Sequence, residues 1–381
     1  MEKEKNSMLL KIKQKLRFLW ENTPRVAKVY FALAAVAFIC RSLCKISTPF
    51  ADFFVRYVAG GVRFLMTSVS NILPFSIAEI FILLIPIVFV FLVLVGVRVS
   101  KSRERSASFA ILLVSILALI YFLFVFTYAT GYQKSTIDKS FSFKANEVSV
   151  EDLSATADWL TSEAMALCDE ELFADKGSLM PFSFAEMNEK LNASFTAVNK
   201  EYDMLFNYYT KAKPVIFSGA MSYTHTLGIY TFFTGEANIN MSYPDYTTVF
   251  TAAHEMSHQR GIARENEANF LAFIVCINAD DDYIRYAGYV NMLEYVLNAL
   301  ATADYELYAA TLTGLPKPIR RELAAYSEIY RKYDKTPVGD ISQTLNDTYL
   351  KSQGTEGRVS YGMVVDLAVS YYKENVEKLP K

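Results

Sequence analysis

Two of the chain's three histidines, His254 and His258, lie four positions apart, and Glu255 directly follows the first. On a helix this spacing stacks both imidazoles on one face, about one turn apart, so that their ring nitrogens can bind one metal ion. A zinc ion held this way polarises the carbonyl of a peptide bond and lowers the pKa of its water. The pattern therefore predicts a metallopeptidase that hydrolyses peptide bonds by a zinc-activated water, with one Zn²⁺ and with Glu255 as general base.

A catalytic zinc site of this kind needs a third protein ligand. The segment after the histidines offers two carboxylates, Glu265 and Glu267. If Glu265 faces the histidines, small residues share its helix face, and Asn269 follows one turn later, placed to accept a hydrogen bond from the ring N–H of a ligating histidine. If Glu267 faces them, the shared face is bulky and apolar, which suits a core. We expect Glu265 to be the ligand, with Glu267 as the alternative.

The spacing of these residues resembles that of the gluzincin branch of zinc peptidases, in which His-Glu-x-x-His is followed on a second helix by Glu-x-x-x-Asp. Residues 254–258 and 265–269 follow this pattern, with Asn269 in the place of Asp. The resemblance implies a zincin-like metallopeptidase domain. The run 254–270, after three amino-terminal apolar segments, also resembles a family of bacterial membrane proteins known only as domain of unknown function 3810. That resemblance implies a bacterial membrane setting and gives no substrate.

A peptidase also needs a donor for the developing oxyanion and a surface that binds an extended substrate. Tyr361, in a loop before the last helix, is our first candidate for the oxyanion donor, and His225 and Tyr223 are the alternatives. The strand-like segment 235–240 precedes the histidine helix. It is expected to be either the edge strand that pairs with a substrate or an ordinary edge strand.

Two other classes of protein compete with the peptidase. A non-catalytic membrane sensor or assembly protein could keep a metallopeptidase fold and its zinc without turnover. Glu255 argues against that class, because a structural zinc site needs no base and closes its fourth coordination position. A metal transporter is disfavoured because its ligands should lie within membrane spans, far from His254.

The elements that carry these residues begin with a membrane region. The chain has 381 residues, of which 52% are hydrophobic, a high share for a soluble protein. Segments 77–97 and 109–128 contain no Lys or Arg over about 20 residues, the length that a bilayer core requires. Segment 27–43 is a weaker candidate because it contains Arg41. This residue lies near the end of the segment, however, where a long side chain can reach the headgroups. We predict three transmembrane helices within residues 27–128.

Basic residues are unevenly distributed around these segments. Eight Lys and Arg precede residue 29 and four lie within 98–105, against three within 45–76. Because positive loops stay in the cytoplasm, we expect residues 1–26 to be a cytoplasmic basic segment. Residues 131–381 are then an extracytoplasmic domain of a multi-pass protein in the cell membrane.

The segment 49–75 is apolar enough to be a fourth span, which would reverse this topology. Arg56 and Arg63 within it favour an interfacial or re-entrant stretch on the outer leaflet instead.

Residues 131–381 have the composition of a globular domain. Ser149 and Ser183 mark helix starts, the second in a capping-box pattern, and 214–243 contains two or three short strands. After Asp245, which can cap the histidine helix, the chain is helical with a looser stretch at 336–358. The expected fold class is mainly α with a small β-sheet (α+β): amino-terminal transmembrane helices followed by the zincin-like domain.

Net charge and cysteine content limit the classes of partner and of cysteine site that the chain can have. The net charge of −2 provides no basic field for nucleic acid, so nucleic acid is not an expected partner. We expect a peptide or protein substrate, from the metal motif, and membrane lipid, from the apolar segments. The four cysteines form no Cys-x-x-Cys pair, and Cys168 and Cys276 are read either as a disulfide in an exported domain or as free thiols. The acidic run 280–282 is expected to cap a helix. The sequence gives no oligomeric state.

Overall fold

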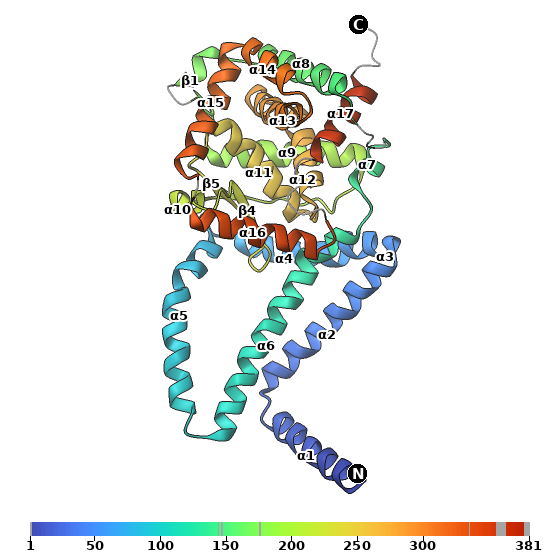
Figure 1. Ribbon diagram of the computed structural model, residues 1–381, viewed down its shortest axis with the longest axis vertical. Helices are drawn as coiled ribbons and strands as arrows, with labels where there is room; N and C mark the ends of the chain where they lie inside the picture. Colours follow the sequence, from blue (N-terminus) through green and yellow to red (C-terminus); the bar gives the residue numbers. More distant parts are fainter. Residues whose placement is uncertain are drawn as a thin grey trace.

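A helical body forms one end of the molecule, and three long helices project from it (Figure 1). The computed structural model describes residues 2–143, 145, 148–174, 177–334, 336–355 and 363–376. The projecting helices are α2 (Arg25–Ile46), α5 (Ile77–Val99) and α6 (Arg103–Thr127), and each is long and apolar enough to cross a membrane. They coincide with the three predicted spans. Helix α1 (Glu2–Glu21) and the turn between α5 and α6 lie at the end away from the body.

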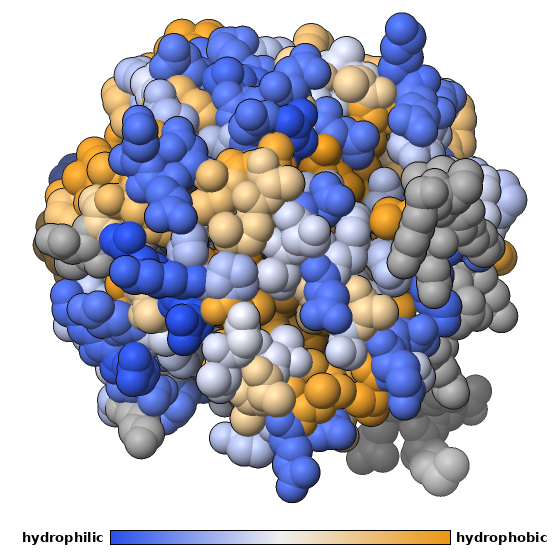
Figure 2. Space-filling view, turned by 90° about the horizontal axis from the view of Figure 1, so that it is seen from above, coloured by the Kyte–Doolittle hydropathy of each residue, from blue (hydrophilic) through white to orange (hydrophobic). Residues whose placement is uncertain are grey.

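The surfaces of the two ends differ in polarity. No residue in the most apolar window of α5 is buried. An exposed apolar surface of this size is unfavourable in water and is typical of contact with lipid. On the face of the body opposite the spans, hydrophilic side chains are interspersed with smaller apolar areas (Figure 2). This distribution fits membrane association of the projecting helices.

The segment between the first two spans lies across the end of the body that faces the spans (Figure 1). It consists of α3 (Thr48–Phe53), a π-helix (Phe54–Ala59) and α4 (Gly60–Ser70). Among the described residues only the three helices named above have the length and hydropathy of a span, and none of the helices in this segment has both. Arg63 of α4 is only 1% exposed and donates a hydrogen bond to the Val55 carbonyl at 2.7 Å. This segment, which we call the platform, lies under the body.

A small mixed sheet lies between this platform and the helices of the body. Its strands are β3 (Ala212–Val215), β4 (Gly228–Thr231) and β5 (Glu236–Asn240), in the order β3-β5-β4. β3 pairs with β5 in parallel, and β4 pairs with β5 antiparallel. The expectation that 235–240 is an edge strand is wrong, because β5 has a partner on each side. The edge strand beside the histidine helix is β4.

The rest of the body is helical, as expected for a mainly α chain with small sheets. Its long helices are α8 (Val150–Ala166), α9 (Phe184–Tyr202), α11 (Asp245–Gln259), α12 (Glu265–Ile277), α13 (Asp282–Ala303), α14 (Tyr305–Gly314), α15 (Lys317–Lys332), α16 (Pro337–Ser352) and α17 (Val364–Asn375). Short elements complete it: α7 (Ile137–Ser140), α10 (Ser218–Ser222), and the hairpin of β1 (Phe173–Ala174) with β2 (Gly177–Ser178). Helices α11 and α12 form the centre of the core.

Several local predictions can be checked directly. Ser149 and Ser183 both begin helices with complete capping boxes. Asp281 caps α13 by accepting a hydrogen bond from the Ile284 N–H, as expected for the acidic run. Cys168 and Cys276 are free thiols. The stretch 336–358, expected to be loose, instead forms helix α16 over most of its length, and its residues 356–358 lie outside the described residues.

Candidate metal centre

Helix α11 carries the two histidines and Glu255. It begins at Asp245 directly after Pro244, and the Asp245 carboxylate accepts a hydrogen bond from the Met180 N–H at 2.9 Å instead of capping the helix. The helix ends just before Gly261, whose φ of +94° lies in the left-handed region that favours glycine. This turn brings α12 back against α11, with the start of α12 beside the histidines.

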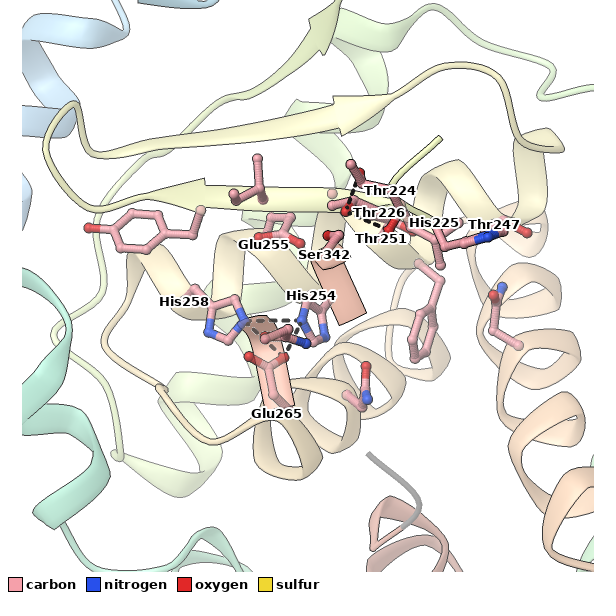
Figure 3. Close-up of a pocket in the computed structure, with 18 of the residues that line it drawn as sticks. Thr224, His225, Thr226, Thr247, Thr251, His254, Glu255, His258, Glu265 and Ser342 are labelled. Atoms are coloured by element: carbon pink, nitrogen blue, oxygen red, sulfur yellow. Dashed lines mark hydrogen bonds and ion pairs between the residues drawn. The ribbon is translucent and has the colours of Figure 1, made fainter. Parts of the chain in front are cut away.

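Three side chains converge on one point between these helices (Figure 3). The Nε2 atoms of His254 and His258 are 3.0 Å apart. Glu265 Oε2 lies 3.3 Å from the first and 3.5 Å from the second. Donor atoms around a tetrahedral zinc with bonds of about 2.0–2.1 Å are separated by roughly 3.3–3.4 Å, so the three atoms fit a shared zinc ion.

The alternative ligand, Glu267, points elsewhere. Its carboxylate accepts hydrogen bonds from the Ile137 N–H at 3.1 Å and from Arg264 Nη1 at 2.7 Å. The Glu267 side chain is 2% exposed, and its carboxylate forms an ion pair with the partly exposed Arg264. The structure therefore brings Glu265, and not Glu267, to the histidines.

Neighbouring groups fix the orientation of the cluster. The Nδ1–H of His258 donates to the Ile262 carbonyl at 2.6 Å, which leaves Nε2 free to bind a metal. The Tyr128 hydroxyl, at the end of span α6, donates to Glu265 Oε1 at 3.5 Å. Asn269 lines the same cavity, but the ring N–H of His258 is taken by Ile262 instead. Among the described residues the buried Nδ1 of His254 has no partner.

Burial and charge act in opposite directions on the cluster. Burial alone would lower the pKa of His258, but the Glu265 carboxylate outweighs it and raises that pKa to about 9. Burial would likewise raise the pKa of Glu265, but the two imidazoles lower it well below its usual range. The Glu265 carboxylate thus favours positive charge on the histidines. A metal cation at this point would interact with the same three side chains.

Glu255 lies between the cluster and strand β4 (Figure 3). Burial raises its pKa, against the opposing effect of His254 and His258, and the Tyr230 N–H donates to its carboxylate. Its Oε2 has no partner within the part of the chain that the structure describes. Gly228 of β4 lies so close that an added Cβ would come within 2.6 Å of Glu255 Oε1. The absence of a side chain at Gly228 therefore lets the strand reach the carboxylate.

These groups open onto a cavity of about 940 Å³. Its walls come from α6, β4, α11, α12, α13, α15 and α16, and none of the described residues that line it is Lys or Arg. Glu294 of α13 is also in the wall, and burial raises its pKa to about 7. The sequence predicted strands within 214–243, where β4 lies, but it did not show that β4 and α16 line the cavity, because both consist of residues without a catalytic signature.

The predicted oxyanion donors have three different placements. His225 lines the cavity, and its ring packs at a tilt against that of Tyr330, with 4.5 Å between centroids. Tyr223 is 48% exposed, packs on Tyr333 and does not line the cavity. Tyr361 lies outside the described residues.

Together these features define a helical protein with a candidate metal centre next to candidate membrane spans. Residues 54–369 match the family described as protein of unknown function DUF3810, and the chain belongs to this family. The resemblance to this family seen in the sequence is thereby confirmed, whereas the gluzincin resemblance stays a prediction. No curated protein matches the chain. No solved structure matches it either.

Proposed function

We propose that the chain is a zinc metallopeptidase anchored in the cell membrane, with a zincin-like body on the extracytoplasmic side. The observation that carries the proposal is the convergence of His254, His258 and Glu265 on one point, with the Glu255 carboxylate beside it. A site built only to hold zinc needs no such buried carboxylate. The cavity around it has the volume of a small-molecule or peptide subsite.

The chemistry follows from the positions of these residues. His254, His258 and Glu265 would hold the zinc, which when bound would polarise the scissile carbonyl and lower the pKa of a water. Glu255 would take a proton from a water in the site and deliver it to the leaving amine. Burial raises its pKa above the ordinary carboxyl value, which favours a group that must accept a proton.

Strand β4 would hold the substrate in an extended conformation. It is the edge strand next to α11, so one row of its backbone groups has no partner strand in the sheet. A peptide can add to such an edge by main-chain hydrogen bonds. Ile229, 51% exposed, and Tyr230 both line the cavity, so side chains of a bound peptide would contact them.

The proposed topology places the body outside the cell, because the basic amino terminus and the basic turn between α5 and α6 lie together at the opposite end. A tag placed after Lys381 should be cleaved by protease added to intact cells. A tag that is cut only after the membrane is opened would contradict this orientation.

The activity can be tested on the full chain in nanodiscs. Purified protein is expected to contain about one zinc, to lose it in His254→Ala, and to keep it in Glu255→Gln and in the control His225→Ala. Cleavage of a peptide library should occur with wild type and fall at least ~100-fold in Glu255→Gln. Zinc in both proteins without cleavage in either would favour the non-catalytic sensor or assembly protein, and zinc retained in His254→Ala would contradict the site.

A further inference from the structure

Helix α16 closes the cavity on the side nearest the spans, and its faces differ in character. The face toward the body lines the cavity with polar side chains: Ser342, Gln343, Asn346 and Tyr349. A second face is exposed and apolar: Val338 is 53% exposed, Ile341 61% and Leu345 64%. These three positions are spaced i, i+3 and i+7, so they form one stripe along the helix. Thr344 is exposed beside this stripe.

The carboxy-terminal end of α16 is attached to two of the candidate spans. Arg41 near the end of α2 donates a hydrogen bond to Gln353 Oε1 at 2.9 Å. The Tyr349 ring packs edge-on against Phe124, in the last turn of α6, with 6.1 Å between centroids. This end of the helix therefore lies at the level where α2 and α6 reach the body.

The other end of α16 lies near the third span. Thr336, which caps the helix, donates to the Tyr223 carbonyl just after α10. The residues before α10 are in turn attached to α5, because Ile216 and Phe217 donate their N–H groups to Glu79 in its first turn. Helix α16 thus extends from α6 toward α5 across the ends of the spans (Figure 1).

The turn between β4 and β5 reaches the same level. The Phe232 ring packs on Phe124 of α6 at 5.4 Å, and the Phe233 ring packs on Phe81 of α5 at 6.2 Å. The proposed peptide-binding strand therefore ends between two spans. Both β4 and α16, on two sides of the cavity, extend to the membrane boundary.

We infer that α16 is an interfacial helix whose apolar stripe lies in the outer leaflet, and that the cavity takes polypeptide segments that are themselves anchored in the same membrane. The substrate class in this inference rests on the proposed peptidase function, whereas the position of α16 does not. Helix α16 is amphipathic, carries three exposed apolar residues along one stripe, and extends across the ends of the spans. An amphipathic helix in this position can contact lipid. A chain anchored beside it reaches the cavity at the high effective concentration of a tethered ligand.

The position of the helix can be measured without any activity. In the full chain with Cys40 and Cys168 replaced by Ser, a fluorescent NBD label is attached to a new cysteine at 345 or, as the matched control, at 344. In nanodiscs containing nitroxide-labelled lipid, the label at 345 should be quenched several-fold more than the label at 344. Equal and weak quenching at both positions would overturn the inference.

The substrate class is tested with one peptide sequence in two forms, a soluble form and a form linked to a lipid in the same nanodisc. The lipid-linked peptide should be cleaved at least ~10-fold faster at equal total concentration. The variant Leu345→Lys should reduce that advantage, whereas the matched control Thr344→Lys should keep it, with zinc content unchanged in both. Equal cleavage of the two forms by wild type would overturn the substrate class. Cleavage of neither would overturn the peptidase proposal with it, while the label would still report where α16 lies.

Discussion

Glu265 and Glu267 lie two positions apart at the start of α12, yet their environments assign them different roles. Glu265 contacts both histidines, and Glu267 pairs with Arg264 and the Ile137 N–H. We expect Glu265→Gln to weaken zinc binding at least ~10-fold, because a neutral amide is a poor zinc ligand. Glu267→Gln should leave zinc binding intact and destabilise the fold by about 1–3 kcal/mol, because Arg264 loses its buried partner.

Zinc affinity, measured by chelator competition, and melting temperature separate the two roles. If Glu267→Gln lost zinc at unchanged melting temperature while Glu265→Gln kept it, the assignment of the third ligand would be reversed. Both variants preserve side-chain size, so neither result can be attributed to a cavity.

The Glu294 side chain predicts how the stability of the fold depends on pH. Burial raises its pKa from 4.5 to about 7, so between these values the folded chain holds a proton that the unfolded chain has released. Wild type therefore loses stability relative to Glu294→Gln as the pH rises from about 4.5 to about 7. The melting temperature of Glu294→Gln minus that of wild type should be roughly 2–6 °C larger at pH 8 than at pH 4.5. A difference that does not change with pH would count against a protonated Glu294 in the cavity wall.

At the scale of elements, the contact between β4 and α11 depends on a glycine. A Cβ at Gly228 would lie 2.6 Å from Glu255 Oε1 and 2.7 Å from Thr251 Cγ2, so Gly228→Ala must move the strand or the carboxylate. We expect kcat/KM for peptide cleavage to fall at least ~10-fold, with zinc content unchanged. The control is Gly219→Ala, where the nearest atom is 3.9 Å away. Similar activity of both variants and wild type would show that the strand does not need this close approach.

Local sequence patterns predicted the elements whose signals are local. The spacing of His254 and His258 predicted a helix with both imidazoles on one face, and Ser149 and Ser183 marked helix starts that the structure contains. The preference for Glu265 over Glu267 also came from a local argument, the size of the residues that share its helix face. The structure places Glu265 beside the histidines.

Features that depend on long-range packing were not predictable in this way. The order β3-β5-β4 is set by pairing between distant segments, so the sequence could not show that the central strand is β5. Helix α16 was missed because its inward face is polar, for example at Gln343, and its apolar residues are exposed. That pattern is the reverse of the amphipathic pattern by which buried helices are recognised.

For the whole molecule, the contacts of a buried ion pair predict that the body and the membrane region fold as one unit. Lys213 of β3 and Glu236 of β5 are 2% and 0% exposed and lie 2.5 Å apart. Lys213 Nζ also donates to the carbonyls of Ser70, the last residue of α4, and of Phe75. Glu236 accepts the N–H groups that begin α5. Both charges therefore depend on residues that precede the predicted domain boundary at 131.

A chain that starts at residue 131 should accordingly fail to fold cooperatively, although it contains the whole metal cluster. Without the membrane region, Lys213 and Glu236 lose hydrogen-bond partners and the sheet loses its cover, at a cost of about 1.5–3 kcal/mol for each lost hydrogen bond to a charged group. We expect a broad unfolding transition by calorimetry and a weakened zinc affinity. The control is a chain that starts at Thr23, which lacks only α1 and should melt like the full chain. A sharp transition with full zinc binding in the shorter chain would show instead that the body folds independently of the helices that anchor it.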